Sequence, residues 1–436
     1  MVSIEKLKNE FDQAELLTKK STEMTVSLEN WDLQDISSQN LMSSSLRVVK
    51  NNKKGANTAT GSSQKVQEKL ITGAEESATY GEKMVFNFSA SSLKNLSARP
   101  KEEYELAEAE EFFAFLEEFT DKFREMKSDL TLDVSLEKQL EKLEIKTTRG
   151  GNLQEDKTNF TLSFGAPIPG GGSQLFRYLE SPSFFQDIPE KMIEDFIREY
   201  EKTEIVSVPS TGKMSVLFSP RALYFLFISL QEGISGRNIF QETSPLLDKK
   251  GEQIFSEKLN IIDRPRMKSA GGRRSFDDEG IPTSEQKIIN QGCLENYIYD
   301  LEYASRLDAE PRGNGLKEAM FGGGIDTPVT PNLVNPVVET GEKSKKELLQ
   351  EIKEGILVED IIGFHSSNYP QGHFSMQAHG FHLKDGKLKG RLQDVMIAGN
   401  IYEDFKRVRA IGDTLYPAYK GYVPYILVDG VSVTGK

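Results

Sequence analysis

A helix with a phenylalanine-rich face is the sequence feature that most constrains the fold. Between Glu103 and Met126, apolar residues recur three and four positions apart, while Glu and Lys fill most other positions. The repeating residues are Ala109, Phe112, Leu116, Phe119, Phe123 and Met126. A helix with one apolar face must cover an apolar surface of another element. The pattern therefore predicts a core helix, in preference to a cofactor site.

The rest of the first half predicts further helices and a sheet for them to cover. Helical spacing recurs at Ile4–Ala14, within Ser63–Tyr80 and at Glu190–Tyr200. Strands are predicted at Thr25–Leu28, Leu46–Lys50 and within Leu132–Phe164, with a hairpin loop at Asn51–Gly55. We therefore expect helices packed on a sheet.

Strands dominate the second half. They are predicted at Glu204–Val208, Met214–Phe218, Ile356–Phe364, Gln393–Ala398 and Tyr422–Val433, with hairpin turns at Gln291-Gly292 (within Gln286–Tyr299) and Asp385-Gly386. An apolar helix is expected from Ala222 to about Leu230. Ser344 and Glu347 form a capping box that opens another helix, and Gly355 should end it.

These patterns predict the α+β fold class with two domains. Residues 1–203 would form an N-terminal domain of helices packed on sheet, and residues 204–436 a strand-rich mixed C-terminal domain.

Charge and cysteine content argue against several classes of function. The net charge of −13 repels a phosphate backbone, so no direct contact with nucleic acid is expected, and the basic stretch Arg264–Arg274 is interpreted as a solvated loop. Cys293 is the only cysteine, so no internal disulfide or thiolate zinc cluster can form. The first residues lack the apolar core of a signal peptide, and no stretch predicts a membrane span. The expected location is the cytoplasm.

All four histidines fall in one segment, at His365, His373, His379 and His382. In an extended segment the first three would share one side, and three imidazoles on one face would suit zinc. No carboxylate is spaced with them as a supporting partner. Ordinary strand or loop histidines are therefore the favoured interpretation, and a metal site at His365, His373 and His379 is the alternative.

No complete catalytic motif is visible. The glycine-rich segment Pro167–Gln174 lacks the Gly-Lys-Ser/Thr of a phosphate loop and predicts an ordinary loop. There is no Gly-x-Ser-x-Gly elbow, and Cys293 has no histidine near it in sequence. No catalytic residue follows from the motifs.

Several stretches taken together resemble the TldD/PmbA family, also called modulators of DNA gyrase. They are Val216–Leu223, Ile234–Phe255, Phe276–Leu307, Asn332–Val358, Gly380–Phe405 and, in the first half, Leu46–Gly61. The likeness keeps the family's order and spacing over most of the chain, and residues 82–130 match least.

The resemblance implies a two-domain α+β subunit that dimerises. TldD-like members cleave unfolded peptides with zinc, which a His-Glu-x-x-x-His motif and a later cysteine hold. Here the motif should fall at Ile228–Gly233, which reads ISLQEG, and the cysteine within Tyr416–Gly421, which reads YPAYKG. Both stretches lack these ligands. The resemblance therefore points to the PmbA-like branch, also called TldE, and leaves it open whether this chain is itself an enzyme.

That branch implies a non-catalytic subunit of a zinc metallopeptidase. No cofactor is expected on this chain, and zinc is expected in a TldD-like partner; the chain would form a heterodimer with that partner, or a homodimer. Unfolded peptides would be held as an added strand, because backbone pairing ignores side-chain identity. The candidate channel walls are Ile356–Phe364 and the residues Phe321, Gly322, Gly323, Gly324 and Ile325. The alternative is a stand-alone homodimeric peptide-binding or regulatory protein, a modulator of DNA gyrase.

Overall fold

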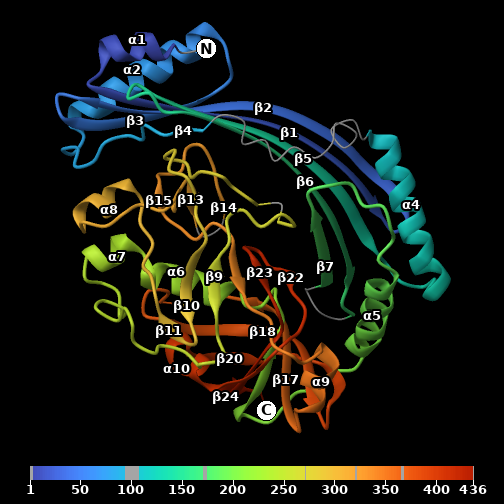
Figure 1. Cartoon of the computed structure of the whole chain (residues 1–436). Coiled ribbons are helices and arrows are strands. Elements are labelled where there is room, and N and C mark those ends of the chain that lie inside the picture. The colour runs from blue at the N-terminus through green and yellow to red at the C-terminus, as the bar shows by residue number, and fades with distance from the viewer. Residues whose placement is uncertain are drawn as a thin grey trace.

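A computed structural model of the chain describes residues 3–93, 108–169, 174–270, 272–319, 322–364 and 368–435. In Figure 1 a long curved sheet from the first half of the chain arches over a second part, built from the remaining residues. None of the helices in the described ranges combines the length and the apolar character needed to cross a membrane.

The arching sheet is antiparallel except at one short edge strand. Its strands are β1 (Gln13–Glu29), β2 (Asp32–Lys50), β3 (Lys53–Thr60), β4 (Ser92–Leu93), β5 (Asp133–Thr147), β6 (Asn152–Pro167) and β7 (Gln174–Ser181). They lie in the order β3-β2-β1-β5-β6-β4, and β7 also pairs with β6. Asn51 and Asn52 have positive φ and form the tight turn between β2 and β3, which confirms the predicted hairpin.

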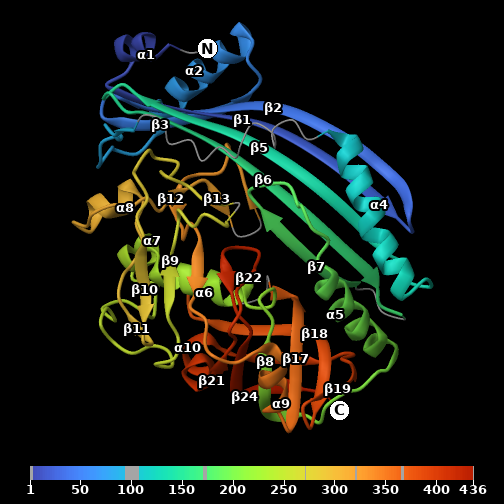
Figure 2. The same ribbon diagram turned by 45° about the vertical axis from the view of Figure 1, so that its right-hand side comes forward.

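Helices cover the outer face of this sheet at its two ends, as Figure 2 shows. They are α1 (Ile4–Glu10), α2 (Gln64–Tyr80), α4 (Ala109–Met126) and α5 (Glu190–Tyr200). Phe112, Phe119 and Phe123 of α4 are fully buried against Phe160 and Phe164 of β6, so the predicted phenylalanine face is a core face. The part of the predicted helix before residue 108 lies outside the described residues.

The first helix is shorter than predicted. It ends at Glu10, and Ala14 belongs to β1, where it packs in the same apolar cluster as Leu7. The regular spacing arises because an extended strand after the helix buries the next apolar residue on the same side.

In the second part, β17 (Glu354–Ile362), β8 (Gly212–Phe218), β24 (Ile426–Thr434), β20 (Met396–Asn400) and β18 (His373–Lys384) pair in a closed ring. Helix α6 (Tyr224–Ile234) packs against this ring and is apolar on nearly all sides. The ring also carries β19 (Lys387–Arg391) and β21 (Val408–Ile411).

A second sheet stands beside the ring. Its order is β11 (Cys293–Leu294), β10 (Gln286–Asn290), β9 (Ile261–Asp263), β16 (Pro336–Val338), β23 (Tyr422–Val423) and β22 (Tyr416–Pro417). Two short pairs are β12 (Gly315–Leu316) with β15 (Thr330–Pro331), and β13 (Glu318–Ala319) with β14 (Gly322–Gly323). In the described part of the chain the remaining helices are α7 (Gly236–Phe240), α8 (Leu301–Arg306), α9 (Lys345–Gln350) and α10 (Ile401–Asp404), with 3-10 turns at Glu201–Glu204 and Phe405–Arg407.

Local predictions in this half are partly confirmed. Both hairpin turns form, with positive φ at Gln291, Gly292, Asp385 and Gly386, and the Ser344–Glu347 capping box is present. The helix that it opens ends at Gln350, and Gly355 is the second residue of β17. A Cβ at Gly355 would lie 2.2 Å from the Ser215 carbonyl oxygen, so this glycine permits close strand contact and is not a helix cap.

The predicted strand at Glu204–Val208 is wrong. Glu204 closes a 3-10 turn, and the following residues make only a bridge to Arg391, through the Ile205 carbonyl and the Ser207 amide. Pro209 follows and cannot donate a ladder hydrogen bond, so the extended segment does not grow into a strand.

Candidate functional site

The N-terminal end of α6 meets the turn between β22 and β23. Arg221 Nε donates a hydrogen bond to Tyr419 Oη at 3.2 Å, and the Tyr224 and Tyr419 ring centroids lie 5.1 Å apart. Tyr419 is 56% exposed although its ring packs against Tyr224. The fold thus brings the N-terminal end of α6, the helix that contains Ile228–Gly233, to the segment Tyr416–Gly421.

The arching sheet contributes a second wall through β7. The Arg221 guanidinium lies 4.7 Å from the centroid of the Phe176 ring, and its Nη2 lies 2.8 Å from Asp360 Oδ2 on β17. Arg221 is therefore held between an aromatic ring of the first part and a carboxylate of the second. In Figures 1 and 2, β7 lies on the side of the sheet that faces the second part.

The hairpin of β13 and β14 forms a third wall. Glu318 is paired with Gly323 across the hairpin, and its carboxylate forms an ion pair with Lys420, next to Tyr419. Gly322 and Gly323 are exposed, and Gly322 has φ of +102°, which favours glycine.

The other predicted channel residues lie around this hairpin. The Gly324 amide donates to Thr327 Oγ1 at 3.0 Å, and Ile325 packs against an apolar cluster on the inner face of the arching sheet. Phe321 lies outside the described residues. Gly322–Ile325 and β17, which contains most of Ile356–Phe364, thus lie near the Tyr419 turn; their contact with a peptide stays a prediction.

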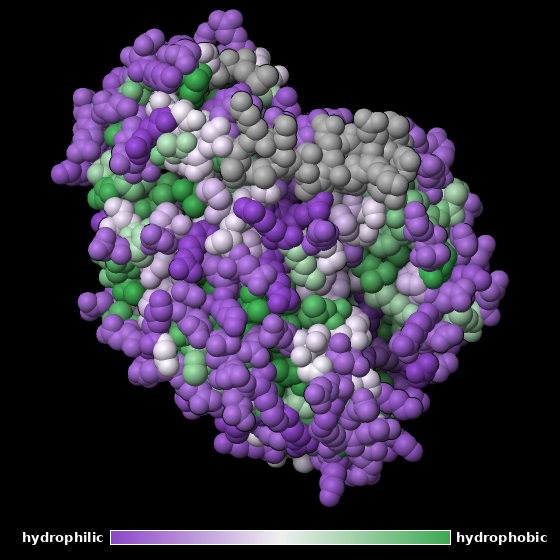
Figure 3. Space-filling view, in the orientation of Figure 1, coloured by the Kyte–Doolittle hydropathy of each residue, from purple (hydrophilic) through white to green (hydrophobic). Residues whose placement is uncertain are grey.

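The inner face of the arching sheet beside these walls is polar. Glu141 forms ion pairs with Lys19 and Lys157, and these cations hold the pKa of its buried carboxyl down at about 2. Burial raises the pKa of Glu137 and of Glu180, and nearby carboxylates raise both further. The face turned toward the reader in Figure 3 is mostly hydrophilic, with small apolar areas between the polar ones.

The helix α6 does not fit a zinc ion at the positions that the resemblance implies. Ile228, Ser229 and Gly233 stand where the motif has its two histidines and its glutamate, and Ser229 and Gly233 are buried in the core. A Cβ at Gly233 would lie 2.1 Å from Tyr402 Oη, which itself donates to the Ser229 carbonyl oxygen at 3.2 Å. Tyr402 fills the space that a ligand at position 233 would need.

Two of the histidines that the sequence singled out are far from each other. His373 and His379 lie on one face of β18, but six residues of strand separate them by about 20 Å. His382 instead accepts or donates hydrogen bonds with Ser207 Oγ at 2.8 Å and Glu354 Oε1 at 2.7 Å, a structural role. His365 lies outside the described residues, and within those residues no three His, Cys, Asp or Glu side chains are grouped to hold a metal.

The basic stretch Arg264–Arg274 is neutralised at its two ends. Arg264 pairs with Glu285 and Glu339, and Arg274 pairs with Asp278. These contacts tie the stretch to its own domain and leave less free positive charge than the sequence suggests.

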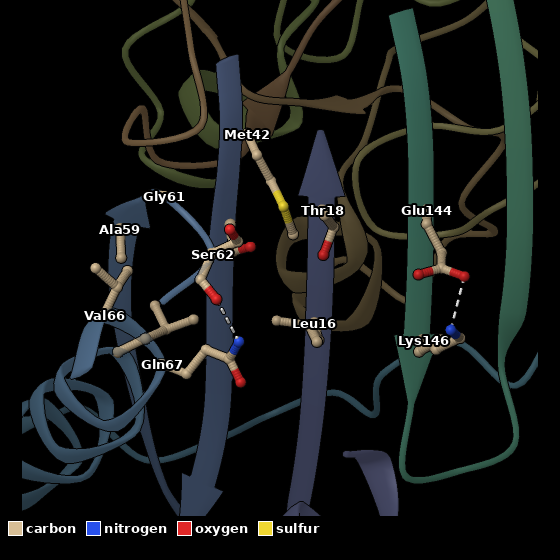
Figure 4. Close-up of a pocket in the computed structure, with 12 residues that line it drawn as sticks. Leu16, Thr18, Met42, Ala59, Gly61, Ser62, Val66, Gln67, Glu144 and Lys146 are labelled. Carbon is tan, nitrogen blue, oxygen red and sulfur yellow. Dashed lines mark hydrogen bonds and ion pairs between the residues drawn. The ribbon is translucent and has the colours of Figure 1, made fainter. Parts of the chain in front are cut away.

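A separate apolar pocket lies on the outer face of the arching sheet, beside α2 (Figure 4). Leu16, Met42, Val66 and Leu70 supply most of its apolar lining, and the Lys146–Glu144 ion pair closes one side. It is on the face opposite to the Tyr419 site.

The sequence did not predict Arg221, Phe176, Tyr419 or Tyr402 as site residues. A signal was present for Arg221, because it is the only charged residue in the apolar stretch Val216–Leu230. The others lie far away along the chain, and only the fold brings them together.

Residues 211–435 match the family described as "PmbA/TldA metallopeptidase C-terminal domain". The chain is 26% identical over 249 residues to a metalloprotease PmbA homolog of Buchnera aphidicola, covering 57% of this chain and 52% of that protein. It is 30% identical over 202 residues to a metalloprotease of Methanocaldococcus jannaschii, covering 46% and 43%. The chain spans about half the length of the curated relatives that it matches.

The fold is similar to the crystal structure of TldE from Thermococcus kodakarensis, with a TM-score of 0.84 and 23% identity over 99% of each chain. At that identity the likeness shows the fold alone.

Proposed function

Because this chain belongs to the PmbA/TldD family, we propose that it is a non-catalytic subunit of a zinc metallopeptidase. It would hold unfolded peptides while a TldD-like partner supplies the zinc. The observation that carries this proposal is the packing of Tyr402 against Gly233. Tyr402 fills the space that the second histidine of the zinc motif would need at position 233. Hydrolysis of a peptide at neutral pH needs an activated water or nucleophile, and the described site offers neither.

The walls of the site suit an extended peptide. Among the described residues, β7 pairs only with β6, so its other edge can accept an added strand. Phe176 and Tyr419 stand beside this edge, and aromatic side chains contribute strongly to binding at such surfaces.

The test is to incubate a disordered peptide with this chain, with a TldD-like partner from the same organism, and with both. We expect chelator-sensitive cleavage only when the partner is present, and faster cleavage with both chains. Tyr419→Ala should weaken the effect of this chain about tenfold, since a large exposed ring is lost. Tyr80→Ala removes a 91% exposed ring elsewhere and serves as the control.

Chelator-sensitive cleavage by this chain alone would overturn the proposal. A partner that cleaves equally well without this chain would favour the stand-alone homodimeric binding or regulatory protein instead.

A further inference from the structure

A small pocket lies where β7 begins, between the arching sheet and the strands β17 and β18. It has a volume of about 30 Å³, which is room for two or three water-sized groups and so for a carboxylate. Residues that line it and matter for its chemistry are Leu175, Arg177, Arg221, Asp360, His379 and Arg391. It adjoins the Tyr419 site because Arg221 belongs to both.

The carboxylates in and around this pocket already have cationic partners. Arg177 pairs with Glu199 and with Glu359, and Lys345 pairs with the same two carboxylates. Asp360 pairs with Arg221. These pairs leave little negative charge in the pocket to repel an anion.

Arg391 has no such partner. Its Nη2 donates to the Pro169 carbonyl oxygen at 3.2 Å and its Nη1 to Gln393 Oε1 at 3.5 Å, and both acceptors are neutral. Its Nε has no acceptor, and among the described residues no carboxylate forms an ion pair with it. A guanidinium without a carboxylate partner is suited to bind one in a forked geometry.

His379 supplies a second polar group without a hydrogen-bond partner. Its Nε2 is buried without a hydrogen-bond partner, and burial lowers the pKa of the ring. A neutral imidazole can donate from this nitrogen to an oxygen in the pocket.

The direction of an added strand decides which end of the peptide lies at the pocket. Gln174, Leu175, Phe176 and Arg177, the first residues of β7, line the pocket. A peptide antiparallel to β7 therefore ends with its C-terminus at the pocket, and antiparallel pairing is the slightly more stable arrangement.

We propose that this pocket binds the terminal carboxylate of an unfolded peptide, with Arg391 as the main ligand. The proposal rests on the peptide-holding function above. It adds the direction in which the peptide lies along β7 and the place where its C-terminus is bound. A chain that recognises a free C-terminus would fix the register of the peptide in relation to a partner's catalytic site.

The test uses the full chain and three peptides of about eight residues with an N-terminal fluorophore, in anisotropy titrations at one salt concentration. The first has a free C-terminal carboxylate, the second a C-terminal amide, and the third an amide with an internal Glu. We expect the free acid to bind at least about tenfold more tightly than either amide, as charge-assisted hydrogen bonds are the strong ones.

Arg391→Gln should abolish this preference by weakening the binding of the free acid to about the level of the amide. Lys389→Gln is the matched control, because it removes one positive charge from an exposed position on the same strand. Arg391→Lys keeps the charge without the fork and should retain only part of the preference. Thermal unfolding by circular dichroism must show that each variant is folded.

Equal affinity for acid and amide would overturn the carboxylate pocket while leaving peptide binding intact. Tight binding of the amide with an internal Glu would overturn the assignment to the C-terminus. If no peptide binds, the peptide-holding function fails as well.

Discussion

The Tyr402 hydroxyl occupies the space that a side chain at Gly233 would need: a Cβ added at Gly233 would lie 2.1 Å from Tyr402 Oη and 3.1 Å from Leu246 Cδ1. Tyr402 is buried, and its hydroxyl donates to the Ser229 carbonyl on the preceding turn of α6. The side chain therefore fills the core at the position where the family resemblance would put a metal ligand.

We predict that Gly233→Ala destabilises the protein. Alanine in place of glycine inside a helix normally stabilises by about 0.5–1 kcal/mol, but here overpacking should cost about 1–3 kcal/mol. The sign of the change in the free energy of unfolding, measured with urea, therefore reports the contact with Tyr402. Gly212→Ala, where a Cβ meets nothing within 4 Å, is the control and should be near neutral.

The double variant Gly233→Ala/Tyr402→Phe tests the contact directly. Removing the hydroxyl leaves Tyr402 Cζ at 3.3 Å as the nearest atom of that ring, so the cost of Gly233→Ala should shrink. An unchanged cost would show that Leu246, and not Tyr402, resists the new methyl group.

We predict that the purified chain holds no stoichiometric zinc, and that writing the metal motif into α6 does not create a site. The variant Ile228→His/Ser229→Glu/Gly233→His should stay metal-free and lose stability, because the new side chains meet Tyr402 and the surrounding core. Elemental analysis of the native chain and the variant measures this. One zinc per native chain would contradict the prediction, and His373→Ala and His379→Ala would then show whether the histidine segment binds it.

Helix α4 shows what the sequence could predict. Its phenylalanines must reach one core, so their spacing follows the helical period, and the prediction from sequence is confirmed. Helical spacing likewise explains why α5 was predicted. The Asp385-Gly386 and Gln291-Gly292 turns were predicted for another reason, because positive φ restricts the residues that fit there.

Strand β2 shows what the sequence could not predict. Residues Asp32–Leu41 are exposed, so no alternation of apolar and polar residues marks them. Within the described ranges, β1 is the one strand that pairs with them and holds them extended. The site was missed for a different reason. Arg221 and Tyr419 are 198 positions apart, and Phe176 comes from the other sheet, so no local pattern connects them.

Buried carboxylates between the arching sheet and the second part should make stability depend on pH. Arg47 on β2 bridges Glu15 and Glu279, with Nη1 2.7 Å from Glu279 Oε1. Burial raises the pKa of Glu15 to about 7, although Arg47 opposes the shift, and burial together with Glu279 raises the pKa of Asp300 to about 7. Asp277, in the same loop as Glu279, also has a raised pKa, chiefly because of burial.

The sign follows from the folded and unfolded pKa values. Between about pH 4.5 and 7 the unfolded chain releases the Glu15 proton while the folded chain keeps it, so raising the pH favours unfolding. Glu15 alone should lower the free energy of unfolding by roughly 2–3 kcal/mol from pH 5 to pH 8, and Asp300 should add a fall of the same sign. Glu15→Gln should therefore reduce the total fall. Urea unfolding at both values measures this, with Glu5→Gln at an exposed position as the control. A native chain more stable at pH 8 than at pH 5 would contradict the assignment.

The last prediction concerns association. Among the described residues, β2 pairs only with β1 between Asp32 and Met42, because β3 begins its pairing at Ser43. This leaves a long strand edge with Leu33, Ile36 and Leu41 exposed, and such edges pair readily with another chain. We expect a homodimer in isolation that uses this edge. Light scattering at about 10 µM should show it, a concentration at which a modest dimer of micromolar Kd is already populated.

Leu33→Lys/Leu41→Lys should shift the protein to monomer, because charged side chains protect an edge from pairing. Tyr80→Lys, at an exposed position on α2, should leave the dimer intact. A native monomer would contradict the homodimer, and a dimer unaffected by the lysines would place the interface elsewhere.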